Sequence, residues 1–201
     1  MLCEGPLLQY DSLKVHALEA LQYYPTQPVF YWFAGVSCVI DKQDRDAIGY
    51  FEKGRKFVVD KNVLADFDSY LGDLYYSVGE TEKSFQAYER VLGVNPDNTL
   101  VLNNYAYYLS LRQEDLDKAK AMALHAVELE PNNAIYLDTY AWVLYQKGEY
   151  KAAEAQMEKA VGLLKAPDKT YYRHYADILQ KVGKADKAKE YENKAKQLHD
   201  E

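Results

Sequence analysis

Residues 99–133, TLVLNNYAYYLSLRQEDLDKAKAMALHAVELEPNN, decide the fold. Large apolar residues lie three or four positions from a small residue in two stretches, which is the spacing of neighbours on one helix face. The small residues are Ala106 in the first stretch and Ala119 in the second. A polar turn, RQEDLD, separates the stretches, and Pro131 ends the second one. The segment therefore predicts a helix, a short turn and a second helix.

The same arrangement recurs along the chain. One series of small residues has spacings of 37, 34, 35 and 35 positions, and its members are Gly35, Gly72, Ala106, Ala141 and Ala176. A second series has spacings of 37, 35, 34 and 35, and its members are Ala47, Ser84, Ala119, Ala153 and Ala188. Turns rich in glycine or polar residues lie between the two series. Each unit is thus predicted to be one pair of helices.

The large residues around these positions resemble the tetratricopeptide repeat (TPR) family. The family pattern combines bulky residues beside the first small residue, a second small residue after the turn, and a closing proline. One unit carries it in full, with Leu102, Tyr105, Ala106, Leu109, Ala119, Ala123, Ala126 and Pro131. Residues 28–64 depart from it, because Val59 stands where the closing proline belongs. Five units in register make the resemblance specific.

The resemblance implies an all-α fold, a right-handed superhelix (α-solenoid) of helix-turn-helix pairs that forms one domain. We expect the chain to be the C-terminal part of a longer array in a bacterial protein. The expected division is a partial repeat with a second helix only at 1–27, repeats at 28–64, 65–98, 99–133 and 134–168, and a terminal repeat at 169–201.

The composition excludes several classes of protein. The 201 residues include 48% hydrophobic residues, which is typical of a folded domain rather than a disordered chain. The net charge of −7 disfavours nucleic-acid binding, because phosphate is repelled. The longest apolar stretch, 28–40, is too short to span a bilayer, so we expect no direct membrane insertion. The sequence leaves the compartment open: the protein is cytoplasmic, or exported if a signal precedes this sequence.

No catalytic or metal-binding pattern stands out. The four histidines, His16, His125, His174 and His199, show no ligand spacing with other candidate ligands. Two cysteines, Cys3 and Cys38, are too few for a four-cysteine zinc site, and Cys38 is interpreted as a core residue. We expect no enzyme activity, no cofactor and no metal.

The first helix of each pair lines the concave face in TPR arrays, so the resemblance also suggests where a partner binds. Residues outside the packing framework of these helices form the predicted peptide-binding groove: Trp32, Tyr70, Asp73, Tyr76, Asn103, Asn104, Tyr107, Asp138, Trp142, Tyr145 and Arg173. Aromatic rings supply contact area, and the acids favour a neutral to basic protein segment or extended peptide. The alternative is that these residues only pack on a half-exposed face.

Two further hypotheses concern what the chain binds: a C-terminal carboxylate, or further repeats of the same kind. Some TPR modules clamp a C-terminal carboxylate with Lys, Arg and Asn, but of the matching positions only Asn104 agrees. A carboxylate clamp is therefore disfavoured. The array is alternatively a structural scaffold that stacks on further repeats, or self-associates, through the N-terminal end at residues 1–27.

Overall fold

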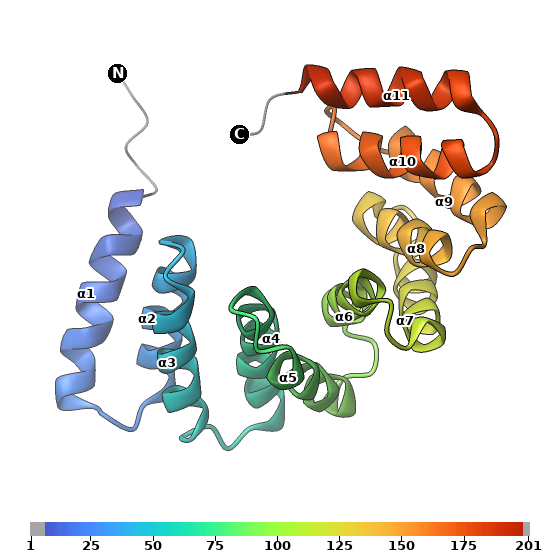
Figure 1. Cartoon of the computed structure of the whole chain (residues 1–201). Helices are drawn as coiled ribbons and strands as arrows, with labels where there is room; N and C mark the ends of the chain where they lie inside the picture. Colours follow the sequence, from blue (N-terminus) through green and yellow to red (C-terminus); the bar gives the residue numbers. More distant parts are fainter. Residues whose placement is uncertain (1–6, 199–201) are drawn as a thin grey trace. The chain divides into compact units, whose positions relative to one another are not determined.

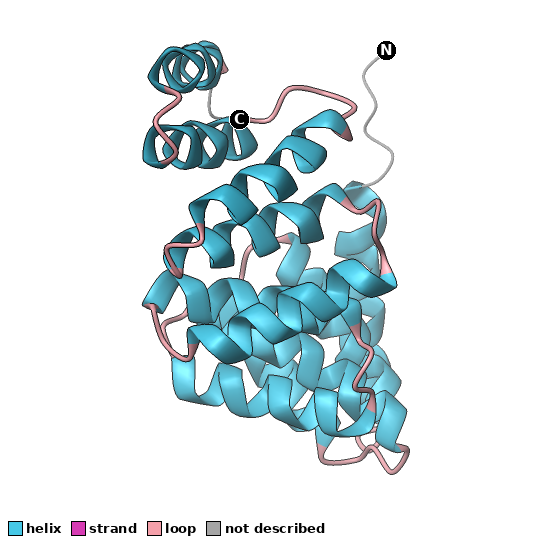
Figure 2. Ribbon diagram, turned by 90° about the vertical axis from the view of Figure 1, so that its right-hand side faces the viewer, coloured by secondary structure: helices cyan, strands magenta, loops and turns pink. Residues whose placement is uncertain are grey.

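The computed structural model describes residues 7–198, with side chains described from Ser12 onward. This part of the chain contains eleven α-helices and no strand (Figures 1 and 2). The prediction of an all-α fold is confirmed. Cys3, His199 and the ends of the first and last predicted repeats lie outside the described residues. The helices are α1 (Leu7–Tyr23), α2 (Pro28–Ile40), α3 (Asp44–Arg55), α4 (Lys61–Ser77), α5 (Thr81–Val94), α6 (Thr99–Arg112), α7 (Leu116–Leu129), α8 (Ala134–Gln146), α9 (Tyr150–Gly162), α10 (Lys169–Lys181) and α11 (Ala185–Gln197).

The helices pack as sequential pairs. The pairs are α2 with α3, α4 with α5, α6 with α7, α8 with α9 and α10 with α11, and α1 packs against α2. Five pairs preceded by one helix confirm the sequence prediction. The chain divides into two compact units, unit 1 at residues 1–96 and unit 2 at residues 97–201. The prediction of a single solenoid domain stays a prediction.

One expected repeat boundary needs correction. The sequence placed it between residues 64 and 65, but this point lies inside α4, which begins at Lys61. The carboxylate of Asp60 accepts hydrogen bonds from the backbone N–H groups of Asn62 (2.8 Å) and Val63 (3.1 Å). This cap satisfies N–H groups that a helix start leaves without partners, so α4 begins one turn earlier.

Capping also explains where the first helices of unit 2 begin. Asn98 accepts from the N–H of Val101, and Asn133 accepts from the N–H of Ile135. Both asparagines follow a proline that comes after the preceding helix, in the turns VNPDN (94–98) and LEPNN (129–133).

The small residues of both series are buried, where the helices of each pair pack closely. The ring of Tyr88 lies against Gly72, where any added Cβ atom would approach it closer than normal packing permits. The ring of Phe51 takes the same place against Gly35. A small residue in one helix thus admits a large ring from its partner, as close packing requires.

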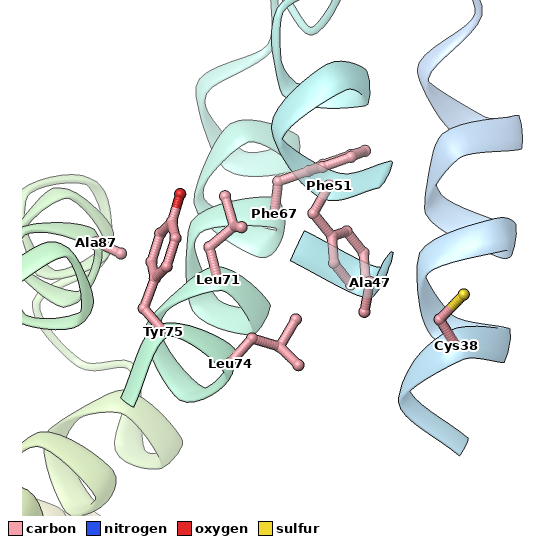
Figure 3. Close-up of a cluster of buried hydrophobic side chains, with 8 residues drawn as sticks. All are labelled: Cys38, Ala47, Phe51, Phe67, Leu71, Leu74, Tyr75 and Ala87. Atoms are coloured by element: carbon pink, nitrogen blue, oxygen red, sulfur yellow. The ribbon is translucent and has the colours of Figure 1, made fainter. Parts of the chain in front are cut away.

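The core of unit 1 lies between α2, α3, α4 and α5 (Figure 3). Phe51 of α3 and Phe67 of α4 meet edge to face, with ring centroids 5.8 Å apart. Cys38 is fully buried and carries a free thiol whose pKa is raised by burial, so the prediction of a core cysteine is confirmed.

A buried acid joins three helices of unit 1. Asp68 of α4 is 1% exposed and accepts from two arginines, Arg55 of α3 and Arg90 of α5. Each guanidinium uses two N–H groups, at 2.8 and 3.1 Å for Arg55 and at 3.0 and 2.8 Å for Arg90. Bidentate pairs of this kind are among the stronger polar contacts. The network therefore links the first two pairs of helices.

Each first helix ends in the same way. A residue with a left-handed backbone follows the helix, and these residues are Lys42, Gly79, Gln113, Gly148 and Gly183. At Gly148, for example, the N–H bonds the carbonyl of Tyr145, and the next N–H bonds the carbonyl of Leu144. This is a Schellman ending, in which glycine is normally preferred. Lys42 and Gln113 adopt the strained conformation without being glycine.

Candidate protein-binding site

Three aromatic side chains stack in unit 2. The Trp142 ring of α8 lies parallel to His174 of α10, with centroids 4.1 Å apart and planes at 18°. Its own helix supplies Tyr145, with centroids 4.8 Å apart and planes at 13°. Because each ring is held by its neighbour, the predicted residues Trp142 and Tyr145 form a pre-ordered surface rather than two mobile side chains.

Asp138 lies at the edge of this stack. The sequence presents it as an acid open to a basic partner, but it is only 7% exposed. Its Oδ1 atom lies 2.9 Å from Nδ1 of His174, and the histidine is also buried. The acid is therefore held by α10, and it orients the imidazole ring on which Trp142 stacks. We call Asp138, Trp142, Tyr145 and His174 the Trp142 cluster.

Two buried polar atoms near these helices lack hydrogen-bond partners among the described residues. They are Nε1 of Trp142 in α8 and Oδ1 of Asn103 in α6. Asn103 is 5% exposed, and its amide donates to Oδ1 of Asn104 at 3.1 Å. Since α6 packs against α8, an unmet donor and an unmet acceptor occupy neighbouring first helices. Leaving such groups unpaired costs free energy.

The other predicted residues have varied surroundings. Tyr107 is half-buried beside Tyr108, with ring centroids 6.0 Å apart. Arg173 is exposed and lines an open hollow of about 590 Å³ between α10 and α11, together with Asp177 and Glu192. Arg173 is thus placed beside two acids.

The predicted residues of unit 1 are mostly tied to its core. Trp32 meets Tyr70 edge to face at 5.0 Å, and Tyr70 also stacks on Phe51 at 5.0 Å. Asp73 accepts a hydrogen bond from the hydroxyl of Tyr88. Asp73 therefore binds the second helix of its own pair, which the sequence did not predict. Tyr76 is half-buried.

A second hollow, of about 310 Å³, lies between the starts of α2 and α4 in unit 1. We call it the Trp32 hollow, and its lining residues are Gln27, Pro28, Val29, Trp32, Val63, Asp66 and Phe67. Sequence reasoning found Trp32 but missed Val29 and Asp66. Both lie six positions before the small residue of their helix, about one turn before the position of Trp32. The position six residues before the small residue of each first helix could therefore have indicated Val29 and Asp66 as lining residues.

The described residues contain no group of three or more His, Cys, Asp or Glu side chains that could hold a metal ion. None of the helices in this part of the chain has both the length and the apolar character needed to cross a bilayer.

Comparison with known proteins identifies the family. Residues 69–171, about half of the chain, match the family described as the cytochrome c-type biogenesis protein H TPR domain. The chain belongs to this TPR family. TPR domains are typically protein–protein interaction modules and generally non-catalytic scaffolds.

Solved structures agree on the fold. MamA from Desulfovibrio magneticus RS-1 has a TM-score of 0.72 and 15% identity, over 85% of this chain and 94% of that chain. PilF from Pseudomonas aeruginosa has a TM-score of 0.72 and 21% identity, over 87% and 77% of the two chains. MamA of strain AMB-1 has a TM-score of 0.65 and 23% identity, over 85% and 98%. No curated protein matches the chain in sequence.

Proposed function

We propose that this chain is a non-catalytic module that binds a protein segment through the first helices of unit 2. The observation that carries the proposal is the pair of buried, unmet polar atoms, Nε1 of Trp142 and Oδ1 of Asn103. Buried polar groups are normally paired, so an exception calls for an explanation. A bound partner supplies the missing hydrogen bonds after side-chain rotation brings these atoms, which solvent does not reach in the free chain, to the surface.

An extended peptide has the matching chemistry. Its backbone carries a carbonyl to accept from Trp142 Nε1 and an N–H to donate to Asn103 Oδ1. The stacked rings of the Trp142 cluster add apolar contact area at low entropic cost, because the stack already orders them. Tyr107 and Asn104 lie half-buried on α6, the first helix that packs against α8. The net charge of −7 favours a neutral or basic segment over an acidic one.

The proposal makes stability and binding change in opposite directions. Trp142→Phe keeps an aromatic ring for stacking and removes the unmet donor, and Asn103→Leu removes the unmet acceptor at similar volume. We expect Trp142→Phe to be at least as stable as the wild type, because a buried unpaired group is lost. Asn103→Leu should be close to the wild type in stability, because it loses the unmet acceptor and also the hydrogen bond to Asn104. Binding to a partner is expected to weaken by about 1–3 kcal/mol for each lost hydrogen bond.

The experiment needs a partner and a control. A photoreactive phenylalanine at position 107 captures the partner in cells, and calorimetry then compares its Kd for the wild type and the variants. Asn193→Leu, on the exposed surface of the second helix α11, is the matched control and should leave Kd unchanged. Variants that lose stability while Kd stays the same would contradict the proposal.

A second candidate function is stacking on further repeats or on a second copy of the chain. Apolar side chains at α1 favour it, since Val15 is 53% exposed and Tyr23 is 78% exposed. Light scattering across a concentration series tests self-association. A dimer that Val15→Glu and Tyr23→Ser dissociate would support it, and a monomer at all concentrations would exclude self-association.

A further inference from the structure

We infer that the Trp32 hollow of unit 1 binds a basic side chain, an arginine or a lysine, of a partner protein. The hollow lies in α2 and α4, whereas the proposed function rests on unit 2. The inference therefore adds a separate recognition site with a defined chemistry.

The walls of the hollow are apolar and firmly held. Trp32 meets the buried ring of Phe67 edge to face at 5.0 Å, and Phe67 itself packs on Phe51 (Figure 3). Val29 of α2 and Val63 of α4 line the hollow and are 45% and 42% exposed. The site is therefore formed in the free protein, with apolar surface that remains in contact with water.

The charged group of the hollow is Asp66. No Lys, Arg or His among the described residues lies within ion-pair distance of it. Asp68, two residues later, is by contrast paired with two arginines. Partial burial, and then the charge of Asp60, raise the pKa of Asp66. Ionisation of this carboxyl group is thus less favourable than for a fully solvated aspartate, and a cation brought by a ligand would relieve this.

A basic side chain fits both the walls and the acid. Arginine and lysine carry an apolar stem with a charge at the tip, so the stem covers the valines and the cation reaches Asp66. The face of Trp32 adds a cation–π contact, and an arginine adds charge-assisted hydrogen bonds. A purely aliphatic side chain would bury Asp66 further without a partner, which costs free energy.

The charge of unit 1 supports the same ligand. Residues 1–96 hold 9 Lys or Arg against 14 Asp or Glu, a net charge of −5. The remaining residues hold 15 against 17, a net charge of −2. The larger negative charge therefore lies on the unit that contains the hollow, where it attracts basic segments.

Short blocked peptides test the inference without a known partner. The probe is acetyl-Ala-Ala-Arg-Ala-Ala-amide, compared with peptides that carry citrulline or norleucine in place of the arginine. Amide shifts of the ¹⁵N-labelled full chain report binding at millimolar peptide. We expect shifts centred on residues 27–32 and 63–67, with the arginine peptide bound about fivefold more tightly than either comparison peptide.

Matched variants distinguish the local effect of the Asp66 charge from the effect of the net charge of the protein. Asp66→Asn should abolish the preference for arginine, whereas Glu82→Gln, the same charge change at an exposed position of α5, should preserve it. Equal binding of the norleucine peptide, shifts spread over the surface, or no binding by the arginine peptide would each overturn the inference. Neither result depends on Asn103 or Trp142, so failure here and failure of the proposed function are distinguishable.

Discussion

At the residue scale, the contact between Gly72 and Tyr88 shows why the repeat pattern requires a small residue at this position. A Cβ added to Gly72 would lie 2.6 Å from Cδ1 of Tyr88. We expect Gly72→Ala to lower the free energy of unfolding by about 1–3 kcal/mol, because the ring must move away. Gly93→Ala is the control, since its Cβ meets nothing within 4 Å, and it should be neutral or stabilising by up to about 1 kcal/mol. Equal urea midpoints for the two variants would contradict the assigned packing.

Asp66 gives a pH-dependent prediction at the same scale. Its pKa is higher in the folded than in the unfolded chain, so the folded state holds the proton more tightly. The cost of ionisation is therefore present above the folded pKa and absent below the ordinary value of 3.8. We expect Asp66→Asn to be slightly more stable than the wild type at neutral pH, with the difference fading as the pH falls toward 3.8. Urea unfolding across pH measures this, and a less stable variant at neutral pH would oppose it.

At the scale of elements, the ends of the first helices show where repeats differ. Gln113 has φ 54° at the position where Gly148 has φ 79°. Gln113→Gly should stabilise the fold by up to about 1 kcal/mol, because glycine adopts this conformation without strain. Gly148→Ala should cost about 1 kcal/mol for the converse reason. Thermal unfolding measures the melting temperatures of the two variants, which should change in opposite directions. Changes in the same direction would show that the backbone conformation at these helix ends does not determine stability.

These helix endings also show what the sequence predicted and what it missed. The spacing of Gly72, Ala106 and Ala141 predicts the helix pairs, because close packing permits only small residues there. The left-handed turn at Gln113 was missed, since glycine is the usual signal for it. The extra turn of α4 was missed because its cap, Asp60, lies outside the family pattern.

The candidate site was less predictable than the fold. The helix spacing predicted Trp142 and Tyr145 as groove residues, and both take part in the aromatic stack. The pairing of Asp138 with His174 was missed, because 36 positions separate the residues and no local periodicity links them. Side chains from different helices meet through tertiary packing, which a single sequence does not encode in its spacing.

At the scale of the whole molecule, repeat arrays gain stability mainly from contacts between neighbours. Asp68 links α3, α4 and α5 of unit 1. We expect Asp68→Asn to destabilise this unit by about 2–4 kcal/mol, because two arginines lose a buried partner. Hydrogen exchange should accelerate in α3–α5 and remain unchanged in α8–α11. An equal acceleration in both units would show instead that the chain unfolds as one cooperative domain.

Crosslinking can determine directly which helices face the partner. A photoreactive phenylalanine is placed in turn at Tyr107 and Tyr145 on the first helices α6 and α8, and at exposed Leu124 and Ala155 on the second helices α7 and α9. Crosslinks in cells are then compared between the two sets. We expect a protein adduct from the first-helix positions and none from the second-helix positions. Adducts confined to the second helices, or absent from both sets, would contradict it.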